Sequence, residues 1–282
     1  MKTEKTACES CPDKSERCEE TCNKKDAADF RFAPRNDVKA VIAVMSGKGG
    51  VGKSSVTALL ASAMAKRGYS VGILDGDITG PSIPRLFGLK GGRLRTGPGG
   101  IIPPETHMGI KVMSLNLLTD REDEAVIWRG PLLAGAVKQF WEEVDWGRLD
   151  YLFVDLPPGT GDVPLTVLQS LPLNGVVIVL SPQDLAVMIV KKAINMTRKL
   201  NVPIIGLVEN MAYLECPKCG EVIYPFGKPQ GEEVSRETGI PLLATLPIDP
   251  DITRFGDEGK VEMLEAGEFT RLVEELEKIG ER

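Results

Sequence analysis

The most informative motif in this 282-residue chain is Gly47-Lys48-Gly49-Gly50-Val51-Gly52-Lys53-Ser54. It has the spacing of a phosphate-binding loop, in which a glycine, any four residues and a second glycine precede lysine and serine. Glycines let backbone N–H groups close around phosphate oxygens because no Cβ stands in the way. Lys53 can then reach the β- and γ-phosphates, and the Ser54 hydroxyl can bind Mg²⁺.

The residues on either side of the loop support this interpretation. Before it, residues 41–45 form a short apolar run that suits a buried parallel strand. After it, residues 56–66 have helical spacing and end before Gly68. Such a helix directs its positive N-terminal end at the phosphates. A glycine-rich turn that matches by chance is the alternative, and it would not require a strand and a helix in these places.

The rest of the chain alternates strand-like and helix-like segments. Residues 91–104 are rich in glycine and proline and indicate a hairpin or loop. Further strands are expected at 71–74, 110–115, 151–154, 175–180, 203–208 and 242–246, and helices at about 131–143, 184–200 and 268–279. This alternation predicts an α/β fold with a twisted, mostly parallel sheet flanked by helices.

Acidic residues follow two of the expected strands. Asp75 and Asp77 come directly after residues 71–74, and Asp155 comes directly after 151–154. Ligands of open parallel sheets bind at the carboxyl ends of the strands, so these acids are placed to order Mg²⁺ and its water molecules. A turn or a helix cap is the alternative role for Asp155. The stretch Pro157-Pro158-Gly159 joins a stiff segment to a free pivot, which suits a switch that senses the γ-phosphate.

The composition argues against several classes of protein. Net charge is −6 and the isoelectric point is about 5.2, so no general basic field favours nucleic acid. No apolar run approaches the length of a membrane span and the first residues are polar, so we expect no membrane partner and a cytoplasmic location. The single histidine, His107, lies near Pro103-Pro104 in a loop-like stretch and is interpreted as a solvated side chain.

Six cysteines fall into two groups, and the second is Cys216 with Cys219. The first lies in residues 1–36 and comprises Cys8, Cys11, Cys18 and Cys22. That segment is charged and poor in aliphatic residues, so we expect a metal- or cluster-binding appendage to a nucleotide-binding domain at 37–282. Zinc and a 4Fe–4S cluster both accept four thiolates, and spacing alone does not choose between them. A disulfide pair is a further alternative, which a reducing compartment disfavours.

Six motifs stand in a fixed order from the phosphate-binding loop onward. They are residues 47–54, Leu74-Asp75-Gly76-Asp77-Ile78-Thr79-Gly80-Pro81-Ser82, Trp128-Arg129-Gly130-Pro131, Asp155-Leu156-Pro157-Pro158-Gly159-Thr160-Gly161-Asp162, Glu209-Asn210-Met211 and Cys216-Pro217-Lys218-Cys219-Gly220. The set resembles the Mrp-type iron–sulfur cluster carriers, a branch of the MinD/ParA-like ATPases that includes ApbC and the cytosolic cluster-scaffold proteins. The likeness covers about residue 38 to the C-terminus. A phosphate-binding loop is common, whereas this ordered set is specific.

The resemblance implies roles for individual residues. Lys48, Lys53 and Asp77 would be catalytic: Lys48 reaches across a dimer to the partner's nucleotide, Lys53 contacts phosphate, and Asp77 orients the attacking water. Mg²⁺ would be held by Ser54, Asp75 and Asp155. Asn210 would recognise adenine, and Pro247 and Asp249 would close over the base. The nucleotide-binding positions in the loop are Gly47, Lys48, Gly49, Gly50, Val51, Gly52, Lys53, Ser54 and Ser55. From its own position alone, Lys48 could equally be a solvated loop lysine.

The resemblance also implies a function. The chain would be an ATP hydrolase that carries 4Fe–4S clusters to recipient apoproteins as a homodimer, with ATP and Mg²⁺ as cofactors. Cys216 and Cys219 match the family's cluster-bridging pair, and two copies of the chain would supply four thiolates. A cluster shared in this way would be labile, because opening the dimer removes half of its ligands. The alternatives for the pair are half of a zinc knuckle or two core cysteines.

The N-terminal cysteines resemble those of the cytosolic scaffold branch, which hold a more tightly bound 4Fe–4S cluster. Here the run has one extra residue, and Cys22 follows the run instead of preceding it, which leaves the fourth ligand open.

The sequence disfavours two other functions. A MinD- or ParA-like spatial organiser is disfavoured because MinD-like proteins end in a basic amphipathic membrane helix, whereas residues 272–279 are acidic. An electron donor like the nitrogenase iron protein is disfavoured because its bridging cysteines are single and far apart in sequence, unlike the Cys-x2-Cys pair of this chain.

Overall fold

The structure is a computed structural model that describes residues 36–77, 83–91, 94–118, 130–265 and 267–281. The predicted metal ligands Cys8, Cys11, Cys18 and Cys22 lie outside these ranges, as do Trp128-Arg129 and residues 78–82 of the motif that follows Asp77. The appendage at 1–36 therefore stays a prediction.

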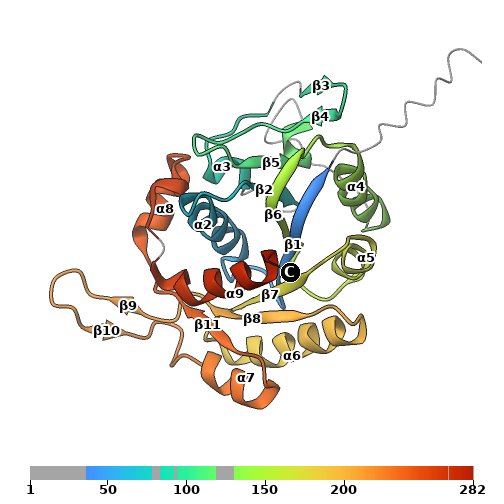
Figure 1. Cartoon of the computed structure of the whole chain (residues 1–282). Helices are drawn as coiled ribbons and strands as arrows, with labels where there is room; N and C mark the ends of the chain where they lie inside the picture. The colour runs from blue at the N-terminus through green and yellow to red at the C-terminus, as the bar shows by residue number, and fades with distance from the viewer. Residues whose placement is uncertain (1–35, 78–82, 92–93, 119–129, 266, 282) are drawn as a thin grey trace, which may run out of the picture. The chain divides into compact units, whose positions relative to one another are not determined.

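Seven parallel strands form the central sheet, in the order β11-β8-β7-β1-β6-β2-β5 (Figure 1). Each pair of neighbours runs parallel. The bounds are Asp37–Ser46 for β1, Val71–Asp75 for β2, Lys111–Ser114 for β5, Arg148–Asp155 for β6, Gly175–Leu180 for β7, Ile204–Glu209 for β8 and Leu242–Thr245 for β11. The predicted parallel α/β sheet is confirmed, and each of the seven expected segments coincides with a strand.

The central strand β1 shows why these segments fold as strands. Residues 40–46 are all buried, and alternate side chains enter two separate cores. Ala40, Ile42 and Val44 pack on one face of the sheet, whereas Val41, Ala43 and Met45 pack on the other. A strand covered on both faces needs an unbroken apolar run, which is what the sequence provides.

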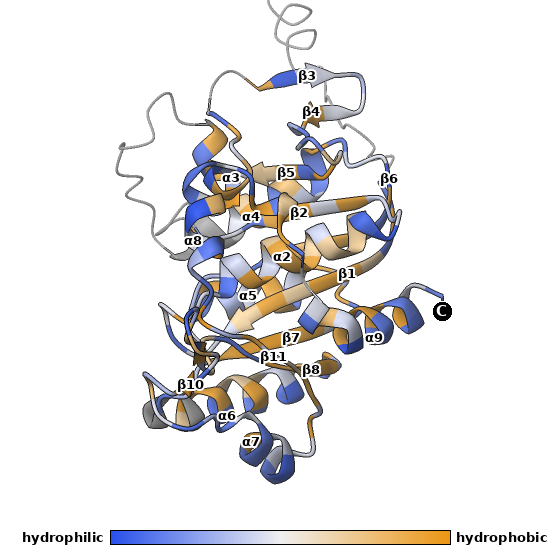
Figure 2. Ribbon diagram, turned by 90° about the vertical axis from the view of Figure 1, so that its left-hand side faces the viewer, coloured by the Kyte–Doolittle hydropathy of each residue, from blue (hydrophilic) through white to orange (hydrophobic). Residues whose placement is uncertain are grey.

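Helices cover both faces of the sheet (Figures 1 and 2). On one face, α2 (Lys53–Lys66) and α9 (Thr270–Gly280) bury apolar residues against the strands, with α3 (Ile83–Leu86) and α8 (Pro250–Asp257) beside α2. The other face is covered by α4 (Gly130–Glu143), α5 (Asp162–Ser170), α6 (Asp184–Lys199) and α7 (Gly231–Thr238). Among the described residues, every helix is too short or too polar to cross a bilayer.

The position of β1 fixes where a ligand would bind. It lies between β6 and β7, with β2 and β5 beyond β6 on one side and β8 and β11 beyond β7 on the other. The order in which the chain adds strands therefore reverses at β1. The crevice at such a switch point, beyond the carboxyl ends of the strands, is where open α/β sheets bind ligands. The phosphate-binding loop follows β1 at this point.

Two hairpins stand apart from the main sheet. β3 (Arg95–Gly97) and β4 (Gly100–Ile102) form a hairpin within residues 91–104, for which the composition predicts a hairpin or a loop. β9 (Leu214–Glu215) and β10 (Val222–Ile223) pair antiparallel and project from the body of the fold (Figure 1). The β9–β10 hairpin carries Cys216 and Cys219. It was not predicted, and neither were the short helices α3, α5, α7 and α8.

Candidate functional site

The phosphate-binding loop has the backbone that its glycines permit. Gly50 and Gly52 adopt φ values of +79° and +75°, in the left-handed region that disfavours side chains. Gly52 directly precedes α2, so the helix begins at Lys53 with its N–H groups open to the loop. Gly47 packs tightly on α6, because a Cβ there would lie 2.8 Å from the Cγ2 atom of Ile189. The loop is thus a cradle of backbone N–H groups at a helix N-terminus, which suits a phosphate chain.

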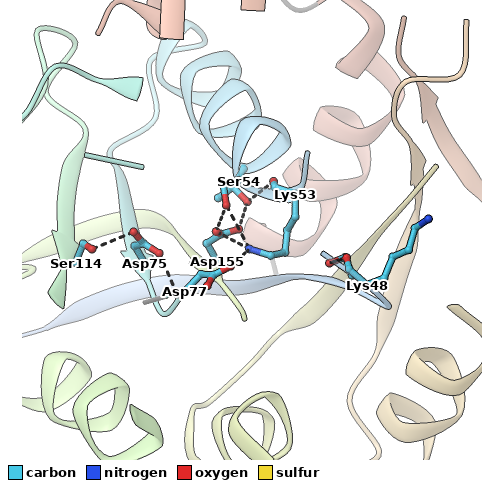
Figure 3. A network of polar contacts seen from close by, with 9 residues as sticks. Lys48, Lys53, Ser54, Asp75, Asp77, Ser114 and Asp155 are labelled. Atoms are coloured by element: carbon cyan, nitrogen blue, oxygen red, sulfur yellow. Dashed lines mark hydrogen bonds and ion pairs between the residues drawn. The ribbon is translucent and has the colours of Figure 1, made fainter. Parts of the chain in front are cut away.

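Asp155, at the end of β6, accepts hydrogen bonds from three side chains in the first two turns of α2, of which Figure 3 labels Lys53 and Ser54. Its Oδ2 atom accepts from Lys53 Nζ and from Ser54 Oγ, both at 2.6 Å. Its Oδ1 atom accepts from Thr57 Oγ1 at 2.7 Å. Asp155 and Thr57 are fully buried, and Lys53 is 5% exposed. The structure therefore brings together Lys53, Ser54 and Asp155 as predicted, and it adds Thr57, which sequence reasoning missed.

Asp75 and Asp77 extend the network from the end of β2 (Figure 3). Asp75 accepts hydrogen bonds at 3.0 Å from the Asp77 N–H and from Ser114 Oγ. The Asp77 carboxylate lies 3.7 Å from Lys53 Nζ. Asp75 is the register partner of Asp155 in the sheet, so two buried carboxylates lie side by side.

Burial raises the pKa of Asp75 well above its usual range, and the negative charge of Asp155 raises it further. Lys53 opposes this shift without cancelling it. A divalent cation between the carboxylates would compensate their charges. Asp75, Asp155 and Ser54 offer only hard oxygen donors, the ligands that Mg²⁺ takes beside a nucleotide phosphate, so the residues fit this ion.

Lys48 does not join this network. Its ammonium group donates to Gln183 Oε1 at the start of α6, and Figure 3 shows the side chain directed away from Lys53 and Asp155. Its backbone carbonyl accepts from Ser46 Oγ at 2.9 Å. Its reach to a partner's nucleotide stays a prediction.

The residues predicted at the base take different places. Asn210 is buried and its Nδ2 atom donates to the Val51 carbonyl at 2.9 Å, so its side chain lies on the phosphate-binding loop. Asp249 caps α8 by accepting from the Asp251 N–H at 2.8 Å. Pro247 and Asp249 line a small hollow together with Leu59 of α2. Asn210 therefore contacts the loop, Asp249 has a structural contact of its own, and the contacts of Asn210, Pro247 and Asp249 with the base stay predictions.

Cys216 and Cys219 lie in the turn of the β9–β10 hairpin. Both are free thiols, Cys216 half-buried and Cys219 exposed. The turn is closed by the Gly220 N–H, which donates to the Cys216 carbonyl at 2.8 Å, and Gly220 has a φ of +73°. Hydrogen bonds from the backbone N–H groups of Lys218 and Cys219, and from the Cys219 thiol, lower the pKa of the Cys216 thiol. A turn that directs N–H groups at a sulfur favours the thiolate, the form that binds metal.

The surface beside these cysteines is apolar. Four large side chains on β10 and just beyond it are 42–45% exposed, namely Val222, Ile223, Tyr224 and Phe226. Within the part of the chain that the structure describes, no group of three or more His, Cys, Asp or Glu side chains is arranged to hold a metal ion. His107 is exposed, as predicted for a solvated side chain.

The sequence of this chain is similar to proteins of a nucleotide-binding family. Residues 37–282 match the ParA family described as NUBPL iron-transfer P-loop NTPases. The chain is 49% identical over 233 residues to the iron-sulfur cluster carrier protein of Clostridium perfringens, covering 80% of this chain and 82% of that protein. It is 46% identical over 222 residues to the cytosolic Fe-S cluster assembly factor CFD1 of Eremothecium gossypii, covering 76% and 79%.

The fold is also similar to that of a solved nucleotide-binding protein. The fold matches a nucleotide-binding protein from Archaeoglobus fulgidus in complex with ADP, with a TM-score of 0.75 and 49% identity. The match covers 83% of this chain and 91% of that protein.

Proposed function

Because the chain belongs to the family of NUBPL iron-transfer P-loop NTPases, we propose that it carries iron–sulfur clusters to apoproteins and hydrolyses ATP as it does so. The similarity to the iron-sulfur cluster carrier protein of Clostridium perfringens and to the cytosolic Fe-S cluster assembly factor CFD1 of Eremothecium gossypii supports the cluster-carrying part. One structural observation carries the proposal: a pair of free cysteines, one half-buried and one exposed, projects on a hairpin from a domain that also contains a complete phosphate-binding loop.

The nucleotide half of the function rests on the network around Asp155. Lys53 is held at 2.6 Å from Asp155 and would turn to the β- and γ-phosphates when nucleotide occupies the loop. Mg²⁺, held by Ser54, Asp75 and Asp155, would neutralise phosphate charge. Asp77 lies beside Lys53 and can accept a hydrogen bond from the attacking water. Lys48 would complete the site from the partner in a dimer.

The cluster half of the function rests on the hairpin. One chain offers two thiolates there, and a 4Fe–4S cluster binds four, so we assign Cys216 and Cys219 as half of a site completed by a second copy. The exposed apolar side chains of β10 support this assignment, because apolar surface next to a half-site is suited to burial between two copies. The cluster is cargo, and separating the copies would release it.

The N-terminal cysteines would form a second site. Cys8, Cys11, Cys18 and Cys22 belong to one chain, and we propose that they bind a cluster or zinc within the appendage at 1–36, independently of dimerisation. The nucleotide-binding domain would then occupy 37–282.

The apolar face of α9 is used within the domain and is not available to lie on a membrane. The apolar residues Leu272, Val273 and Leu276 of α9 are buried in the core of the domain. The remaining face carries charges of both signs, and Glu275 and Glu277 pair with Lys278 and Arg67.

The proposal is tested by replacing both hairpin cysteines with alanine. After anaerobic reconstitution, the iron and sulfide content of Cys216→Ala/Cys219→Ala should be lower than that of the wild type by about one cluster per dimer. The variant should also no longer form the dimer that depends on the cluster, as measured by its mass in solution. Binding of ADP should be unchanged. Lys218→Ala is the matched control, because it alters the same turn and keeps both thiols. Unchanged iron content in the double variant would remove the hairpin from the proposal.

A further inference from the structure

Glu209 is a buried carboxylate that nucleotide chemistry does not use. It is the last residue of β8 and is 1% exposed. Its Oε1 atom accepts from the Gln230 N–H at 2.7 Å, and its Oε2 atom accepts from the Gly231 N–H at 3.0 Å. Gln230 and Gly231 begin α7, so Glu209 satisfies two N–H groups at a helix N-terminus. One side chain thereby joins the two ends of the segment 210–230, which carries the β9–β10 hairpin.

The same segment begins on the phosphate-binding loop. The Asn210 amide donates to the Val51 carbonyl, and a Cβ on Gly52 would overlap that amide. The terminal methyl of Met211 lies 3.4 Å from the same Cβ position. Met211 has a φ of +59°, an uncommon conformation for a residue with a side chain. The first two residues after Glu209 are therefore packed on the loop that would hold phosphate.

The base of the hairpin continues the sheet and is not a loose loop. The Leu246 N–H donates to the Glu209 carbonyl at 2.8 Å, and the Ala212 N–H donates to the Leu246 carbonyl at 2.9 Å. The Ile248 N–H donates to the Tyr213 carbonyl at 2.6 Å. Tyr213 directly precedes β9. An unbroken chain of contacts therefore runs from Val51 through residues 209–213 to the strand that leads to Cys216.

We propose that Glu209 is a positioning residue that ties the cysteine hairpin to the phosphate-binding loop, so that nucleotide in the loop changes the hairpin. Nucleotide that draws the loop N–H groups or the Asn210 amide towards itself must move the start of the segment 210–230. Glu209 holds the end of the segment 210–230 to its start. A displacement of Asn210 therefore also moves the β9–β10 hairpin, because the segment cannot adjust its two ends independently. The functional meaning of this coupling rests on the proposed cluster site, whereas the coupling itself does not.

Amide hydrogen exchange of the cluster-free protein tests the coupling. Exchange is measured by mass spectrometry with and without Mg²⁺ and a slowly hydrolysed ATP analogue, in peptides from the loop at 47–54 and from the hairpin at 212–224. In the wild type we expect nucleotide to change exchange in both peptides, by at least about fivefold, the lower end of ordinary coupling between sites. In Glu209→Gln, one oxygen acceptor is lost, and we expect the loop response to remain while the hairpin response disappears.

Glu233→Gln is the matched control, because it removes one carboxylate from an exposed position in the same turn of α7. It should respond like the wild type in both peptides. A merely structural role for Glu209 would raise hairpin exchange equally with and without nucleotide. A hairpin response in Glu209→Gln equal to that of the wild type, or no hairpin response in the wild type, would overturn the proposal.

Gly231→Ala keeps the test decisive if Glu209→Gln does not fold or does not bind nucleotide. A Cβ at this position would lie 2.7 Å from Glu209 Oε2 and 2.9 Å from Leu242 Cδ1, so it would displace the carboxylate without removing it and would also shift the side chain of Leu242. The same loss of the hairpin response is expected, and its persistence would overturn the proposal.

A parallel measurement on reconstituted protein follows cluster loss to an iron chelator with and without nucleotide. The nucleotide dependence of that rate should vanish in Glu209→Gln and persist in Glu233→Gln. If the wild type bound no cluster at the hairpin, the proposed function would fail, while the exchange experiment on the cluster-free protein would still decide the coupling.

Discussion

Replacing Lys53 with methionine should destabilise the nucleotide-free protein far more than a surface lysine of equal geometry. Lys53 Nζ lies 2.6 Å from Asp155, and the two side chains are 5% and 0% exposed. Lys39 Nζ lies 2.7 Å from Asp150, with side chains 45% and 22% exposed. Removing one partner of a buried pair leaves an uncompensated charge and costs about 3–5 kcal/mol. An exposed pair contributes roughly 0–1 kcal/mol.

These free energies predict distinct melting temperatures. For a domain of this size, 1 kcal/mol shifts Tm by roughly 2–4 °C, so Lys53→Met should lower it by roughly 6–20 °C. Lys39→Met should lower it by less than about 4 °C. The double variant Lys53→Met/Asp155→Asn removes both charges of the buried pair and should recover part of the loss.

Thermal unfolding of the cluster-free proteins, followed by circular dichroism, measures these shifts. Added Mg²⁺ and ADP should raise the Tm of the wild type and of Lys39→Met but not that of Lys53→Met, because ligands stabilise only the protein that binds them. Equal losses in Lys53→Met and Lys39→Met, or a double variant no more stable than Lys53→Met, would refute the account of a buried charge network.

Three further predictions concern single groups. Gly52→Ala should cost about 1–2 kcal/mol of stability, since φ is +75° there, and should also weaken ADP binding measured by calorimetry because the new Cβ meets Asn210; an unchanged Kd would show that the Asn210 contact is irrelevant to the loop. Asp75→Asn should raise the Tm of the nucleotide-free protein at pH 7 while weakening the Mg²⁺ dependence of nucleotide binding, because burial and Asp155 disfavour the Asp75 charge; a lower Tm would contradict this. Burial also raises the pKa of Glu209, outweighing its two N–H donors, so its folded pKa exceeds its unfolded one. Protonation of Glu209 therefore favours folding, and this contribution is complete below the unfolded pKa and is lost as the pH rises through the folded pKa. Urea unfolding from pH 4 upward should show the free energy of unfolding of the wild type falling relative to that of Glu209→Gln until the folded pKa is passed. A wild type that gains stability relative to Glu209→Gln as the pH rises would contradict the raised pKa.

Much of the fold could be predicted because the strands of a sheet covered on both faces are unbroken apolar runs. Residues 41–45 and 175–180 have no other plausible structure beside a phosphate-binding loop. Short helices such as α7 carry little periodic signal, because eight residues make only about two turns. The β9–β10 hairpin has two residues in each strand, too few for alternation to show.

The parts of the site that could be predicted are the side chains at fixed positions of a sequence motif. Lys53, Ser54 and Asp155 meet as expected, since each sits at a position that the motif fixes. Thr57 was missed, although it lies one helical turn after Lys53 and so shares its face.

Glu209 belongs to the motif Glu209-Asn210-Met211, but its sequence position alone does not predict its role. It ends a buried strand with an acid, the same signal that singled out Asp75 and Asp155. Its partners lie 21 and 22 residues further along the chain, and no spacing rule connects them in advance.

Transfer of a cluster to an apoprotein decides whether Cys216 and Cys219 deliver the iron–sulfur cluster. Wild type and Cys216→Ala/Cys219→Ala are reconstituted anaerobically, mixed with an apoprotein that needs a 4Fe–4S cluster, and followed by the activity that the recipient regains with Mg²⁺ and ATP present. The wild type should activate the recipient and the double variant should not, although the phosphate-binding loop of the double variant still binds nucleotide. Equal activation by the two proteins would contradict the account and would assign delivery to the cysteines at 8, 11, 18 and 22.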